Sequence, residues 1–110
     1  MAEVLGIFDQ RILNGTEETI YTVTAAHTFI PKTISITNLH TTNIGTVTIY
    51  FVAPADIAGN KNVVLKDKSL IAEETLFVNT DMYLQAGYKI IVKAGSASTL
   101  NCQLSGLDLS

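Results

Sequence analysis

Residues 19–52 read TIYTVTAAHTFIPKTISITNLHTTNIGTVTIYFV, and this stretch decides the fold. It contains two runs rich in β-branched and apolar residues, 28–39 and 46–52, joined by a connection rich in Asn, Thr and Gly. β-Branched and large apolar residues favour extended strands, whereas Asn and Gly favour turns. The two runs are therefore predicted to pair as an antiparallel β-hairpin.

The second run alternates between apolar and polar residues with a period of two. Val47, Ile49 and Phe51 share one parity, and Tyr50 belongs to the other together with the threonines. This period is typical of a strand with one buried face, because successive side chains of a strand point to opposite sides. We expect the first parity to face a hydrophobic core.

Turn signals recur along the rest of the chain about every 8–12 residues, as in sandwiches and barrels. They predict about eight short strands and no amphipathic helix. The expected fold is all-β, an antiparallel β-sandwich of jelly-roll or Ig-like type. In the closing strand Cys102 has the parity of Leu100 and Leu104, so it is predicted to lie in the core, and Gly106 is predicted to form a β-bulge.

Length and composition limit the possible classes. The 110 residues suit one domain, and 47% hydrophobic against 15% charged residues excludes a disordered chain. We expect an N-terminal strand or arm over residues 1–13 and a single β-sandwich domain over 14–110. The net charge is −3 and the Lys and Arg residues are scattered, which argues against nucleic acid as a partner. No membrane span or secretory signal is expected.

Residues that could carry chemistry are few and isolated. Neither His27 nor His40 has a patterned neighbour that would complete a metal site. A single cysteine in an apolar strand lacks the base that a nucleophile needs. We therefore expect no enzyme activity, no metal and no cofactor.

Exposed apolar residues are the better candidates for function. The first segment is apolar enough to need a partner, and Tyr50 points outward from its strand. The candidate assembly contacts are Val4, Leu5, Ile7, Phe8, Ile12 and Tyr50.

Several segments together resemble small virion proteins of tailed bacteriophages. They are TIYTV at 19–23, ITN at 36–38, TVTIYF at 46–51, IAEET at 71–75 and LQAGYKI at 84–90. The resemblance covers about three quarters of the chain and concerns strands and turns. Thr24 and Tyr88 depart from the pattern, which often has Pro and an acidic residue there.

The resemblance implies a β-sandwich that works by assembly in the virion after synthesis in the host cytoplasm. It points to a capsid decoration (cement) protein that binds the major capsid protein or other virion proteins as a homo-oligomer, with a trimer favoured. The alternative is a tail, baseplate or adhesin module that binds a receptor glycan. That alternative predicts exposed tyrosines beside Asn or Asp in a groove, although the chain has no Trp.

Overall fold

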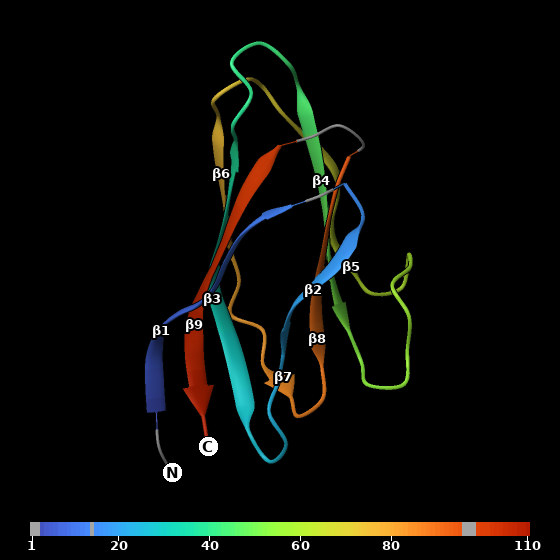
Figure 1. Ribbon diagram of the computed structural model, residues 1–110. Helices are drawn as coiled ribbons and strands as arrows, with labels where there is room; N and C mark the ends of the chain where they lie inside the picture. The colour runs from blue at the N-terminus through green and yellow to red at the C-terminus, as the bar shows by residue number, and fades with distance from the viewer. Residues whose placement is uncertain (1–2, 14, 96–98) are drawn as a thin grey trace.

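The computed structural model describes residues 3–13, 15–95 and 99–110. They form two antiparallel sheets packed face to face, so the predicted all-β sandwich is confirmed (Figure 1). The strands in this part of the chain are β1 (Glu3–Leu13), β2 (Glu17–Thr22), β3 (Thr28–Asn38), β4 (Gly45–Val52), β5 (Val63–Leu70), β6 (Thr75–Asn79), β7 (Leu84–Gln85), β8 (Lys89–Ala94) and β9 (Leu100–Leu109).

The strand order identifies the sandwich as a jelly roll. One sheet has the order β1-β9-β3-β6, with the short β7 added beside β3, and the other has the order β2-β8-β4-β5. The chain crosses between the sheets after β1, β2 and β3, which an eight-stranded jelly roll does. An Ig-like sandwich would keep its first two strands in one sheet. The jelly-roll alternative is therefore the one observed.

The predicted hairpin between residues 28–39 and 46–52 is wrong. The strand β3 pairs with β9, β6 and β7, whereas β4 pairs with β5 and β8 in the opposite sheet. Residues 39–44 cross from one sheet to the other. The period-two pattern was a correct guide to faces but not to partners, because alternation says nothing about which strand lies alongside.

The buried side chain of Asn38 holds this crossing. Its amide nitrogen donates hydrogen bonds to the backbone oxygens of Asn43 and Leu70, at 2.9 and 3.1 Å. Its side-chain oxygen accepts one from the backbone nitrogen of His40 at 3.0 Å. Gly45 leaves room for this side chain and for Leu100, because a Cβ there would lie 3.4 Å from Asn38 Nδ2 and 2.9 Å from Leu100 Cδ2. Asn38 thus connects the end of β3 with the start of β4 and the end of β5.

The core lies between the sheets and contains residues of the predicted inward parity, although Val52, on the other parity of β4, is buried as well. Val47, Ile49 and Phe51 of β4 are buried, as is Cys102 of β9. Burial raises the pKa of the Cys102 thiol to about 12, so the thiol is protonated and inert at neutral pH. Cys102 is therefore a core residue, as the sequence predicted.

The irregularities beside β9 lie on its neighbours and not at Gly106. The register shifts between Ile7 and Asp9 in β1 and between Pro31 and Thr33 in β3, while β9 runs through without a break. The bulge predicted at Gly106 is therefore wrong. Glycine is needed there for space, because a Cβ would lie 2.5 Å from the Phe29 ring.

Candidate functional site

The outer face of the five-stranded sheet carries few charges, and Lys32, exposed at the β3 bulge, is paired with Asp81 at 2.9 Å. Residues opposite one another on neighbouring strands share a face, so the positions beside the buried ones point outward. We call this surface the uncharged face and define it by its outward residues: Leu5, Ile7, Gln10, Ile12, Thr28, Ile30, Thr33, Ser35, Thr37, Thr75, Phe77, Asn79, Asn101, Gln103, Ser105, Leu107 and Leu109. Glu3, opposite Leu109, stands at its corner.

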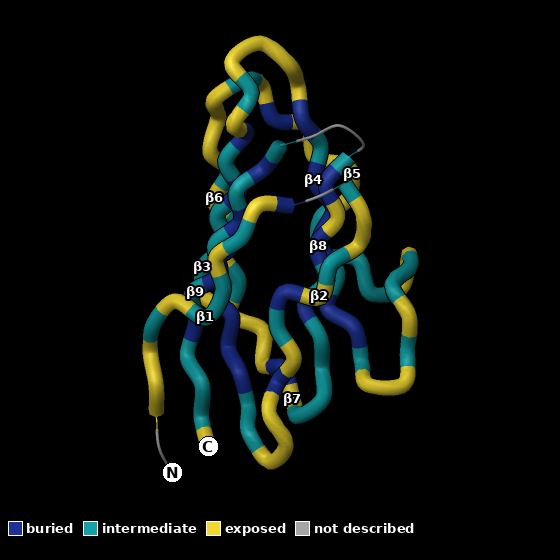
Figure 2. Tube along the Cα trace, in the orientation of Figure 1, coloured by how far each residue is buried: buried dark blue, intermediate teal, exposed yellow. Residues whose placement is uncertain are grey.

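Large apolar side chains stand exposed at both sides of the uncharged face. Leu5, Ile7 and Ile12 on β1 are 75%, 60% and 55% exposed, and Phe77 on β6 is 64% exposed. Between Ile7 and Phe77 lies a shallow depression of about 390 Å³, floored by Thr33, Ser35 and Ser105 among others. Figure 2 shows the exposed stretch in β1 near the N-terminus.

The polar groups of the uncharged face are bonded to one another. Thr33 donates to Asn79 at 3.0 Å, the Thr37 and Thr75 hydroxyls lie 2.9 Å apart, and Gln10 reaches Gln103 at 3.5 Å. Neutral groups that already have partners lose little when water leaves, unlike charged ones. The face can therefore be covered at a low desolvation cost.

The outer face of the four-stranded sheet is different. We call it the charged face and define it by its outward residues: Glu17, Thr19, Thr22, Thr48, Tyr50, Lys89, Ile91 and Lys93. Glu17 lies opposite Lys93, and Thr48 is bonded to Asp67 at 3.1 Å. Burying these charges would cost far more than burying the neutral groups of the uncharged face.

The predicted assembly contacts do not form one surface. Leu5, Ile7 and Ile12 lie together on the uncharged face. Val4 is exposed at the sheet edge, opposite Asp108 and therefore on the inward parity. Tyr50 lies half-buried on the charged face, on the other side of the sandwich.

Phe8 points inward, on the side opposite to the preceding residue Ile7, and the register shift after Ile7 turns Asp9 inward as well. Its ring packs edge-on against Phe29 and Tyr21, with centroid distances of 5.0 and 5.5 Å. Burial raises the pKa of the Tyr21 hydroxyl, and the charge of Asp108 adds to the shift. Phe8 thus helps to close one end of the core.

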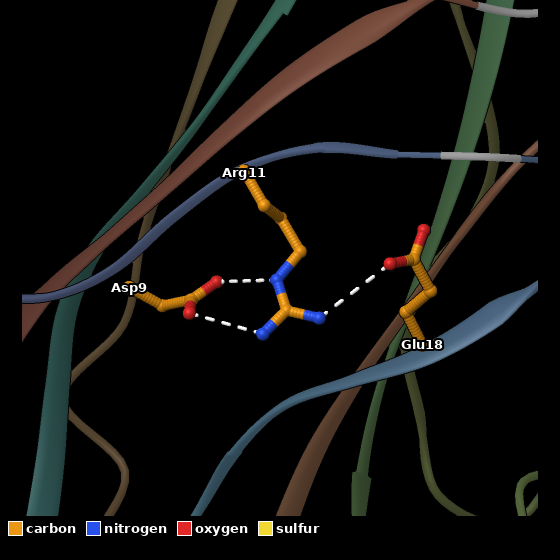
Figure 3. Close-up of polar contacts among 3 residues, drawn as sticks. All are labelled: Asp9, Arg11 and Glu18. Atoms are coloured by element: carbon orange, nitrogen blue, oxygen red, sulfur yellow. Dashed lines mark hydrogen bonds and ion pairs between the residues drawn. The ribbon is translucent and has the colours of Figure 1, made fainter.

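The strand β1 forms the edge of its sheet, paired with β9 from Glu3 to Leu13. Past the bulge, Asp9 and Arg11 point toward the interior, where Arg11 binds Asp9 through two nitrogens at 2.7 and 3.0 Å and Glu18 of β2 at 3.5 Å (Figure 3). The hydrogen bonds to Asp9 raise the pKa of Arg11, so it stays charged. This ion network joins the edges of the two sheets.

Groups that could carry chemistry remain scattered. His27 Nδ1 lies 2.8 Å from Asp108 Oδ1, which is a contact between a turn and β9 that requires no ligand. Within the described ranges, no three His, Cys, Asp or Glu residues are placed to hold a metal ion. None of the described residues forms a helix that could cross a membrane.

Phe77 is the residue of the uncharged face that sequence reasoning missed. It has the same parity as Thr75 and Asn79, which was a signal that it shares their side of β6. Its exposure follows from the pairing of β6 with β3, where Phe77 lies opposite Ser35.

No protein family model and no curated protein matches the sequence. The fold is similar to a chain in the structure of infectious bursal disease virus, Gx strain, with a TM-score of 0.54 and 11% identity over 98% of this chain and 31% of that chain. A chain in the structure of the Gt strain gives a TM-score of 0.39 and 9% identity over 97% and 29%, a likeness too weak to add evidence. This chain spans about a third of the length of the chains it matches. The first likeness shows a shared fold.

Proposed function

We propose that the chain is a structural protein of a virion and assembles through the uncharged face. The observation that carries this proposal is the contrast between the two outer faces. One presents Leu5, Ile7, Ile12 and Phe77 among neutral partnered groups, and the other presents charges. The likeness to a chain from a virus structure and the use of jelly rolls in capsids support the virion as its location.

The energetics favour repeated contacts over a single one. Burying the four apolar side chains would contribute about 1–2 kcal/mol each, because each is already partly covered. Association costs at least about 4 kcal/mol in lost freedom of motion. One such contact is therefore weak, whereas contacts repeated around an oligomer or a capsid lattice reinforce one another.

The more specific proposal is a capsid decoration protein of a tailed phage, acting as a homotrimer on the major capsid protein. It is supported by the sequence resemblance at 19–52 and 71–90, and neither matched structure comes from a tailed phage. This role would require binding by surface burial and no catalysis.

The test is binding of the purified chain to particles of the encoding virus that were assembled without it. We expect saturable co-sedimentation, and a loss of about hundredfold in affinity for Ile7→Lys combined with Phe77→Lys, because each Lys would have to be buried unpaired. Thr19→Lys combined with Thr22→Lys puts the same charge on the charged face and should bind like the natural chain. Absence of binding, or equal binding by both variants, would contradict the proposal.

A further inference from the structure

A second surface feature lies at the end of the sandwich and shares no lining residue with the depression of the uncharged face. The connection between β4 and β5 and the segment from Met82 to Tyr88 enclose a depression of about 520 Å³. This volume is within the usual range of small-molecule sites. Phe51 and Leu84 belong to its apolar floor, and Tyr83 stands at the rim, 70% exposed.

The walls of the depression are held in place without a ligand. A Cβ at Gly87, whose φ is +85°, would lie 2.7 Å from Pro54 Cγ, so the two walls are in close contact. The Asn62 side chain accepts a hydrogen bond from the Gly59 backbone nitrogen and donates one to the Ile57 oxygen, both at 2.9 Å. A site shaped in advance loses little free energy to ordering when a ligand enters.

The polar groups around the depression suit a neutral ligand. Asp56 and Lys61 are the charged residues among its described lining, and they pair with each other at 3.2 Å. Their charges offset one another, so the site offers no net attraction to a phosphate or to a cation. Gln85 is exposed beside them and can both donate and accept hydrogen bonds.

The combination of an aromatic ring with hydrogen-bonding groups matches a sugar ring. A saccharide presents a face of C–H groups, which packs on an aromatic side chain, and hydroxyls that both donate and accept. We infer that this depression binds a neutral saccharide, with Tyr83 and Tyr88 contacting the ring and Asp56 and Gln85 contacting its hydroxyls. Tyr83 is fully outside the core, which suits a residue kept for a ligand and not for folding.

The test is an NMR titration of the ¹⁵N-labelled full chain with methyl galactoside, methyl glucoside, N-acetylglucosamine and N-acetylgalactosamine, and with sialic acid as a charged comparison. We expect saturable shifts at the amides of Tyr83, Gln85 and Asp56, with a dissociation constant on the order of millimolar. Tyr83→Ala should weaken binding about tenfold, because it removes the stacking surface. Ile44→Ala removes an exposed side chain of the β3–β4 connection that does not line the depression, and it should change nothing.

Three results would overturn the inference: no saturable shift with any neutral sugar, shifts only with sialic acid, or equal affinity for the natural chain and Tyr83→Ala. The readout is separate from particle binding, since Tyr83 is not part of the uncharged face.

Discussion

The two outer faces of this sandwich are built by the same rule and end with opposite properties. On both sheets, every second residue turns outward except at the bulges, yet one face carries Leu5, Ile7 and Phe77 and the other carries Glu17 and Lys93. Alternation therefore determines which residues point outward, and it gives each sheet one buried face and one outer face. The identity of the outward residues determines which side a partner can cover, because charges resist the removal of water.

The largest effect is expected at Asn38, whose side chain holds the connection between the two sheets. Asn38→Ala removes the side chain that bonds the backbone oxygens of Asn43 and Leu70 and the His40 nitrogen. The free energy of unfolding should fall by about 4 kcal/mol, because buried polar groups lose their partners and a cavity remains. Urea unfolding measures this. Asn43→Ala, in the same connection but exposed, should cost little, and an equal loss in both variants would contradict this role.

The two faces are separated by a core from which water is excluded. The pKa of the buried Cys102 thiol tests whether this core is dry. Its pKa is raised to about 12 in the folded chain, above the unfolded value of about 8.5. Because the folded pKa is the higher one, this contribution to stability is complete below the unfolded pKa and is lost as the pH rises through 12. The natural chain should lose about 3 kcal/mol more than Cys102→Ala between pH 8 and pH 11.

Unfolding by urea at several pH values compares the two proteins. Parallel pH profiles would mean that water reaches the thiol, and that the inner face of the five-stranded sheet is less dry than the structure indicates.

The smallest effect is expected at the seam between the two sheets. Arg11→Met removes the cation that joins Asp9 of β1 to Glu18 of β2. The free energy of unfolding should fall by about 1 kcal/mol at low salt, since the pair is partly exposed and the network loses charge-assisted hydrogen bonds. The loss should shrink in high salt because ions screen the remaining charges. Lys61→Met breaks a more exposed ion pair, with Asp56, and should lower the free energy of unfolding by less than Arg11→Met does. A larger decrease for Lys61→Met would contradict the importance given to the Arg11 network.

The sequence was sufficient for the fold class and for several of the residues that fill the core. Val47, Ile49 and Cys102 could be assigned to the interior because strand parity depends only on neighbours in the chain. The pairing of β3 with β9 could not be predicted, because the two strands lie far apart in the sequence and their alternation would fit many partner strands.

The candidate surfaces were predicted less well for the same reason. Leu5, Ile7 and Ile12 were chosen because they are apolar, but Phe77 joins them only through the register of β6 on β3. Phe8 points inward because it follows the outward Ile7, and alternation could have separated these two neighbours. The depression beside Tyr83 is assembled from two connections that are remote in sequence, so its residues could not be grouped in advance.

The most direct test of the central claim is sedimentation velocity of the natural chain over a wide concentration range, beside the two double-lysine variants. We predict reversible association of the natural chain and of Thr19→Lys with Thr22→Lys. For Ile7→Lys with Phe77→Lys we predict a monomer at every concentration. A natural chain that stays monomeric throughout, or an Ile7 and Phe77 double variant that associates as well as the control, would contradict assembly through the uncharged face.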